Sequence, residues 1–196
     1  MTRIAEAQPT ELAKIQELQN KILEDKKKLA EMRRNAPNEE VSDYTFTSHD
    51  GSEIKLSDMF GTHQDLILIH NMGRGCAYCT LWADGFIGFT EHLENRAGFV
   101  VISKDEYTIQ RNFHKSRGWN FKMHSSHNST FNRDMGYEDD KGSQMPGISA
   151  FHKDANGKIW RTGSTWFGPG DDFCAVWPMF DLLKDGPNGW APKFSY

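Results

Sequence analysis

Cysteine is scarce in this chain: only three occur among its 196 residues, and they are unevenly placed. Cys76 and Cys79 are close together, whereas Cys174 lies far along the chain. Small secreted proteins that depend on disulfides carry more cysteines, in even numbers and at regular spacings. A close pair plus one distant cysteine is typical of a reducing compartment, so we expect a cytoplasmic protein.

Long apolar runs and excess positive charge are also missing. No run approaches the roughly 18–20 apolar residues that span a bilayer, and the start, Met1–Glu6, lacks the apolar core of a secretory signal. The formal net charge of -4 gives no concentrated positive field for phosphate groups. We therefore expect neither a membrane nor a nucleic acid as partner.

The pattern of residues 9–34, in the N-terminal segment, predicts one helix with Thr10 as its cap. A thin apolar stripe recurs at near-helical spacing along this charged segment: Leu12, Ile15, Leu18, Ile22, Leu29 and Met32. Such a stripe packs against the surface of its own domain or against a second subunit, as the arm of a homodimer. We take residues 1–37 as an N-terminal helical extension and residues 38–196 as the main domain.

The main domain predicts a mixed α/β fold. Expected strands lie at 44–46, 53–56, 66–70, 99–103, 147–152 and 158–162, and expected helices at 57–60, 76–95, 107–117 and 173–183. Parallel central strands need helical crossovers, and the closing hairpin around residues 154–157 supplies an antiparallel edge. Residues 119–144 give no clear assignment, and Pro178 must lie in the first turn of the last helix or kink it.

The chemistry of this chain centres on Cys76-Ala77-Tyr78-Cys79, which follows a buried strand and opens a helix. At a helix N-terminus, unpaired amides and the helix dipole favour a thiolate. Cys76 is therefore the expected catalytic nucleophile, and Cys79, one turn deeper, is the expected resolving thiol. The expected substrate is a disulfide or thiol, either in a protein or in a small molecule, and no cofactor is needed.

Two other interpretations of the cysteine pair remain. Half of a zinc site would need a second ligand pair, and the spacing of His114, His124 and His127 offers only one i,i+3 pair. We therefore expect no metal. The other interpretation is a pair of buried structural thiols, which is also the simplest account of Cys174, although Cys174 could act as a second resolving cysteine.

Several segments resemble a family of thioredoxin-like proteins of unknown function, the domain-of-unknown-function group 899. The resemblance runs from Val41 to Ala191 and rests on Gly75–Cys79, Trp82–Gly85, Gly118–Phe121, Ser125-Ser126, Phe131–Gly136, Pro146–Ser149 and Trp177–Leu183. It implies an α/β fold with a thioredoxin-like central mixed sheet flanked by helices, and a peroxiredoxin-like N-terminal part. It implies no particular substrate, because fold membership does not confer activity.

In a thioredoxin-like fold, the proline before the hairpin strand faces the cysteine pair through a cis peptide. Pro146 occupies that position, although a proline is equally allowed at the start of a strand. We take Pro146, Tyr78 and Trp82 as substrate-binding residues. The aromatic residues as a group are more typical of a core than of a ligand pocket.

This chain departs from thioredoxins in two ways. Ala77-Tyr78 replaces the usual Gly-Pro between the cysteines, and His70 stands where a buried acid is usual. His70 is either a proton relay for Cys79 or a satisfied core histidine. Gly73 stands where thiol peroxidases carry threonine.

Four polar residues, Ser125, Ser126, Asn132 and Asp134, either line a pocket beside Cys76 or cap an irregular loop. The sequence favours a thiol–disulfide oxidoreductase. A thiol peroxidase and a non-enzymatic binding or assembly module are the alternatives.

Overall fold

The computed structural model describes residues 4–196, with side chains from residue 10 onward. The chain divides into two compact units, one ending at Pro37 and the other spanning Asn38–Tyr196. Within the described residues, no helix has the length and apolar character needed to cross a membrane.

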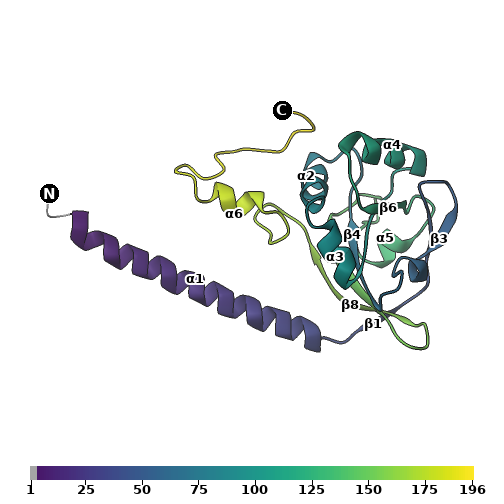
Figure 1. Cartoon of the computed structure of the whole chain (residues 1–196), viewed down its shortest axis with the longest axis horizontal. Coiled ribbons are helices and arrows are strands. Elements are labelled where there is room, and N and C mark those ends of the chain that lie inside the picture. Colours follow the sequence, from purple (N-terminus) through teal and green to yellow (C-terminus); the bar gives the residue numbers. More distant parts are fainter. Residues whose placement is uncertain (1–3) are drawn as a thin grey trace. The chain divides into compact units, whose positions relative to one another are not determined.

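The first unit is one helix, α1, which spans Ile4–Asn35 (Figure 1). The expected start at Pro9 with Thr10 as cap is therefore wrong. The residues before Pro9 are mostly alanine, glutamate and glutamine, which favour a helix strongly enough to extend it past the proline. The six apolar side chains of the predicted stripe are all exposed, from 45% at Leu29 to 70% at Met32.

The second unit is built on one eight-stranded mixed sheet in the order β1-β8-β7-β4-β5-β6-β2-β3. The strands are β1 (Glu39–Val41), β2 (Thr45–Thr47), β3 (Glu53–Lys55), β4 (Asp65–His70), β5 (Gly98–Ser103), β6 (Lys122–Ser125), β7 (Gly147–Lys153) and β8 (Ile159–Trp166). Strands β4, β5 and β6 are parallel, while β7 runs antiparallel to β4 and forms a hairpin with β8. The predicted combination of a parallel centre and a closing antiparallel hairpin is thus present.

The helices of the second unit are α2 (Ala77–Phe86), α3 (Thr90–Arg96), α4 (Tyr107–Arg117), α5 (Phe131–Asp134) and α6 (Val176–Phe180), with a short 3-10 turn η1 at Leu56–Asp58 (Figure 1). Helices α2 and α3 connect β4 to β5, and α4 connects β5 to β6. The helix expected over 76–95 is two helices, because Gly85 and Gly88 weaken it where α2 ends. The last helix is shorter than expected, and Pro178 lies in its first turn, where its missing N–H costs no helical hydrogen bond.

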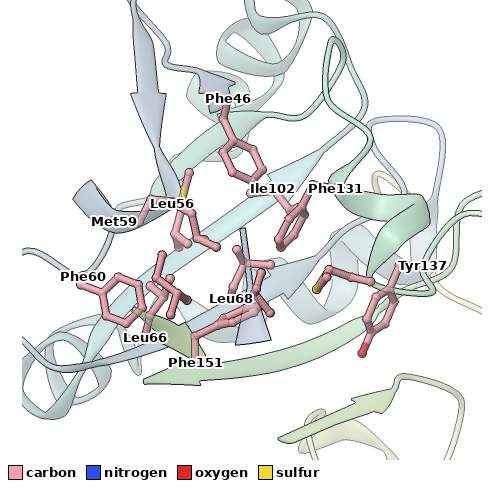
Figure 2. Close-up of a cluster of buried hydrophobic side chains, with 14 residues drawn as sticks. Phe46, Leu56, Met59, Phe60, Leu66, Leu68, Ile102, Phe131, Tyr137 and Phe151 are labelled. Atoms are coloured by element: carbon pink, nitrogen blue, oxygen red, sulfur yellow. The ribbon is translucent and has the colours of Figure 1, made fainter. Parts of the chain in front are cut away.

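Two hydrophobic clusters cover the two faces of the sheet. The first packs η1 and α5 against one face, with Phe131 directed at the strands that carry Leu68 and Ile102 (Figure 2). The second packs α2 and α6 against the other face and includes Ile69, Cys79 and Trp177. Because side chains alternate along a strand, neighbouring residues of β4 belong to different clusters. This alternation decides which residues can reach the cysteines.

Gly147 begins β7 where three segments meet, and its lack of a side chain is required there. A Cβ at this position would lie 2.5 Å from the Thr165 carbonyl oxygen and would also overlap the Tyr137 ring. We expect Gly147→Ala to lower the free energy of unfolding by about 2 kcal/mol, the cost of overpacking a core. Urea denaturation measures this change.

Gly163→Ala on the adjacent strand β8 is the matched control, because a Cβ there meets no atom within 4 Å. We expect it to change stability by less than about 0.5 kcal/mol. Equal effects of the two substitutions would contradict the crowding at Gly147.

Candidate functional site at the cysteine pair

The loop from β4 to α2 is held by the end of β5. The Asn71 backbone N–H donates to the Ile102 carbonyl at 2.9 Å, and the Arg74 N–H donates to Asp105 Oδ2 at 2.7 Å. Between them, Gly73 adopts a φ of +95°, and a Cβ there would lie 2.6 Å from the Asp105 carboxylate. Asp105 and the glycine together therefore set the path by which the chain reaches Cys76.

Cys76 is the N-cap of α2, as the sequence predicts. Its backbone is extended, its carbonyl accepts from the Thr80 N–H at 3.0 Å, and its Sγ accepts from the Cys79 N–H at 3.1 Å. The sulfur thus takes the place that a serine or aspartate oxygen occupies in an ordinary cap. This geometry presents the sulfur of Cys76 to the unpaired amides of the first helical turn.

The two cysteines differ in exposure. Cys76 is half-buried, whereas Cys79 is only 2% exposed, and both are free thiols. The Met72 backbone N–H lies 3.4 Å from Cys79 Sγ and donates to it. An incoming reactant therefore reaches Cys76 first, with Cys79 behind it.

The same contacts separate the acidities of the two thiols. The hydrogen bond from the Cys79 thiol, together with the backbone N–H groups of Cys79 and Tyr78, lowers the pKa of Cys76 to about 6 against the opposing effect of burial. The hydrogen bond to Cys76, burial and the neighbouring negative charge raise the pKa of Cys79 far above its ordinary value. At neutral pH the pair is one thiolate and one thiol, and the donors that stabilise the thiolate are neutral groups.

His70 does not face the cysteines. It is 1% exposed, its ring stacks on Tyr137 at 3.6 Å between centroids, and its Nε2 lies 2.9 Å from Ser149 Oγ. Tyr137 belongs to the first cluster and Cys79 to the second, so the sheet lies between His70 and Cys79. Burial also lowers the pKa of His70 well below its ordinary value.

The hypothesis of a direct proton relay from Cys79 to His70 is therefore wrong, because the His70 side chain points to the face of the sheet opposite the cysteines. The polar residue on the cysteine side is Asn71, which sequence reasoning missed. Its side-chain Nδ2 donates to the Cys79 carbonyl at 3.3 Å, and its Oδ1 accepts from the Gly73 N–H at 2.8 Å. The sequence signal that could have revealed it is the strict alternation of faces along the strand.

Pro146 lies immediately before the hairpin strand β7, but the peptide bond that precedes it differs from the expectation. The next residue, Gly147, pairs with His70, so Pro146 comes just beyond the strand end from which the cysteine loop departs. Its carbonyl accepts from the Phe167 N–H at 2.9 Å. Among the described residues no peptide bond is cis, so the expected cis bond before Pro146 is a trans bond instead.

Tyr78 and Trp82 have different surroundings. Trp82 is 3% exposed, packs on Phe167 at 5.3 Å between ring centroids, and donates from Nε1 to Asp171 at 3.4 Å. A substrate cannot reach it without rearrangement, so a direct substrate contact by Trp82 finds no support. Tyr78, in contrast, is half-buried and forms one wall of a groove.

This groove has a volume of about 300 Å³ and lies between α2, α6 and the C-terminal segment. Its walls are Tyr78, Pro169, Gly170, Trp177, Asp181, Pro187, Gly189 and Trp190. A larger concavity of about 500 Å³ is lined by Phe180 and residues 183–190 and includes no residue of α2. The smaller groove is the one that adjoins the cysteine helix.

Three of the four polar residues of the other predicted pocket, all except Ser126, form side-chain hydrogen bonds with neighbouring segments instead. The Ser125 hydroxyl donates to the Asp105 carbonyl at 2.6 Å, the Asn132 side chain donates to Gln144 at 2.7 Å, and Asp134 accepts from the Tyr44 hydroxyl at 2.8 Å. These bonds fit the interpretation of a capped irregular loop.

The remaining candidates lie apart from a metal or redox site. Among the described residues, no group of three histidine, cysteine or acidic side chains could hold a metal ion. His124 is buried, and desolvation lowers its pKa to about 4. Cys174 is 6% exposed in the second cluster, and burial raises the pKa of its thiol.

A parallel strand–helix–strand core, an antiparallel hairpin and a cysteine pair at the start of the helix after the central strand define a thioredoxin-like α/β protein. Three solved structures share this fold. Peroxidoxin BcpB from Mycobacterium tuberculosis is 22% identical, with a TM-score of 0.52 over 62% of this chain and 80% of that one. A peroxiredoxin-like protein from Aquifex aeolicus is 17% identical, with a TM-score of 0.52 over 66% and 74%. AhpC from Enterococcus faecalis is 14% identical, with a TM-score of 0.53 over 68% and 82%.

Residues 3–193 match the model of the family described as bacterial protein of unknown function (DUF899), and the chain belongs to this family. The resemblance seen in the sequence motifs is thereby confirmed and extends into the N-terminal helix. Comparison with curated proteins gives no match.

The acidity of Cys76 is directly measurable. Because the thiolate is the nucleophile, the rate of alkylation of Cys76 should rise with pH through a midpoint of about 6. Cys79→Ala removes the strongest thiolate donor, so we expect the midpoint to move up toward about 8.5, the value of a free cysteine.

Cys79→Ser is the control for this shift, because its hydroxyl can still donate to Cys76 Sγ and should keep the midpoint nearer that of the native protein. Alkylation followed by mass spectrometry assigns the rate to Cys76. An unchanged midpoint in Cys79→Ala would mean that the helix amides alone lower the pKa.

Proposed function

We propose that this protein is a thiol–disulfide oxidoreductase in which Cys76 is the nucleophile and Cys79 the resolving thiol. The observation that carries the proposal is the N-cap geometry: a half-buried Cys76 sulfur 3.1 Å from the Cys79 N–H, with a pKa lowered to about 6. A thiolate available at neutral pH beside a buried, protonated second thiol is the arrangement that disulfide exchange needs.

The reaction proceeds by two displacements. The Cys76 thiolate attacks one sulfur of a substrate disulfide, forms a mixed disulfide, and releases the other half as a thiolate. Cys79 gives its proton to that departing thiolate, attacks Cys76 Sγ, and releases the second half. The substrate is reduced by two electrons, the Cys76–Cys79 disulfide forms, and an external dithiol must reduce it for the next turnover.

The positions of the other residues suggest supporting roles. Asn71 holds both the Cys79 carbonyl and the Gly73 amide, and it therefore positions the loop on the cysteine side of the sheet. Pro146 lies just before β7, beside the strand end from which the cysteine loop departs, and the half-buried Tyr78 meets substrate from the groove wall. His70 and Trp82 are buried, each with ring packing and one side-chain hydrogen bond, and we assign neither of them a direct contact with substrate.

A thiol peroxidase is the second candidate, and the lowered pKa of Cys76 favours it as well. In that reaction the Cys76 thiolate attacks a peroxide oxygen, giving a sulfenic acid and an alcohol or water. Cys79 then condenses with the sulfenic acid, and water leaves. The fold neighbours carry peroxiredoxin names, but Gly73 replaces the threonine expected of such enzymes, so we place disulfide exchange first.

Cysteine substitutions distinguish an enzymatic function of this protein from a function as a binding module. With bis(2-hydroxyethyl) disulfide and a dithiol donor, we expect Cys76→Ser to lose at least about a thousandfold in turnover, because it removes the nucleophile. Cys79→Ser should lose turnover but accumulate a mixed disulfide at Cys76, which mass spectrometry detects. Cys174→Ser is the matched control and should keep native turnover.

Native turnover in Cys76→Ser would rule out the proposal. Rapid reaction with hydrogen peroxide, combined with slow reaction with disulfides, would instead establish the peroxidase.

We also propose that residues 1–37 form a dimerisation arm for the domain at 38–196. The six exposed stripe residues of α1 leave an apolar face that a second copy of the helix would cover. Ile22→Glu combined with Leu29→Glu should convert a dimer to one subunit of 22.5 kDa, measured by sedimentation equilibrium.

Gln16→Glu with Asn20→Glu is the control for the arm, since both residues lie off the stripe on the same helix. This pair should leave the mass of the assembly unchanged. A native protein that sediments as a single subunit would contradict the arm.

A further inference from the structure

The groove beside the cysteine helix has aromatic walls from three separate segments. Tyr78 lies 6.2 Å from Trp177 between ring centroids, with their planes at 33°, and Trp190 lies 6.2 Å from Trp177 at 68°. The three rings, with Trp177 buried and Tyr78 and Trp190 half-buried, line a space of about 300 Å³. Pro169 and Pro187 complete the walls with backbone of restricted freedom.

The groove and the segment that forms it carry a net negative charge. Of the described residues that line it, Asp181 alone is charged, and it is exposed to solvent. The whole segment 168–190 contains four aspartates and one lysine, a net charge of -3. Aromatic faces carry negative potential at their centres, so rings and carboxylate together attract a cation and disfavour an anion.

The groove is connected to the reactive sulfur through α2. Tyr78 is the second residue after Cys76 in the first turn of α2, and both side chains pack against the same hydrophobic cluster as Trp177. The groove wall formed by Tyr78 and the reactive Cys76 therefore belong to the same first turn of α2.

We infer that this groove binds an organic ammonium group, and that the substrate is a low-molecular-weight disulfide carrying such a group. The second half of this inference rests on the proposed function. The Cys76 thiolate attacks the disulfide sulfur nearer to it and expels one aminothiolate, which takes the proton of Cys79. The Cys79 thiolate then displaces the second aminothiolate, which takes a proton from water, and the Cys76–Cys79 disulfide remains.

Ligand binding tests the groove without any redox chemistry. The probes are choline and 3,3-dimethylbutan-1-ol, its uncharged analogue of the same shape, titrated into the Cys76→Ser protein and followed by tryptophan fluorescence. We expect choline to bind at least about tenfold more tightly than the alcohol. Equal affinities, or tighter binding of the alcohol, would overturn the cation site.

Two matched pairs of variants localise the binding. Asp181→Asn should remove most of the preference for choline, whereas Asp185→Asn, an acidic neighbour outside the groove, should retain it. Trp190→Leu should weaken choline binding about tenfold, and Trp190→Phe, which restores an aromatic face, should recover most of it. Loss of binding in Asp185→Asn equal to that in Asp181→Asn would refute the assignment to this groove.

Kinetics test the substrate class. Cystamine, a disulfide with two ammonium groups, is compared with the neutral bis(2-hydroxyethyl) disulfide in reaction with the reduced protein. Each rate constant is divided by that for the same disulfide with free dithiothreitol, which removes intrinsic differences in reactivity. We expect a corrected preference for cystamine of about tenfold or more, and we expect Asp181→Asn to reduce that ratio.

The results distinguish the two proposals. Choline binding without reaction of either disulfide would refute the oxidoreductase while supporting the cation groove. Reaction of both disulfides with a corrected ratio near one would refute the substrate class while leaving disulfide exchange intact.

Discussion

The hydrogen bond from the Cys79 backbone N–H to Cys76 Sγ is the interaction on which the site depends. It caps α2, because it satisfies an amide that the helix itself leaves unpaired. It also orders the two thiols in space and in acidity, since the sulfur that accepts it is the more exposed one and becomes the thiolate. The cap of the helix thus rests on this 3.1 Å contact, and the low pKa of Cys76 rests on the same contact together with the stronger hydrogen bond from the Cys79 thiol. A cysteine in this position is a stabilising cap and a reactive group at once.

The contacts of the loop from β4 to α2 place Cys76 at the start of the helix. Asp105 at the end of β5 receives the Arg74 amide, and the positive φ of Gly73 allows the chain to pass against its carboxylate. Asn71 then fastens the loop to the Cys79 carbonyl from the other side. Because β4 and β5 are parallel neighbours, their carboxyl ends meet at one edge of the sheet, and residues distant in sequence come together there.

Much of the fold could be predicted from local pattern. The buried run of β4, the helix α4 closed by Gly118 and the hairpin of β7 and β8 all agree with periodicity and turn residues. The failures have physical causes. Residues 119–144 contain β6 and α5, which are too short to show a hydrophobic periodicity in the sequence. Their positions depend on packing against strands that lie far away in the sequence. The proton relay at His70 failed because one step along a strand moves a side chain to the opposite face.

The sequence by itself determined the central element of the site: two cysteines three residues apart, after an apolar run and at the start of a helix. Those features are local, so spacing and composition suffice to predict them. Only the tertiary structure decided what surrounds them. Asn71 lies on the cysteine face while His70 does not, and Tyr78 meets Trp177 and Trp190, which lie about a hundred residues further along the chain. Side chains from distant segments become neighbours only when the sheet and its covering helices pack, and no local pattern encodes that packing.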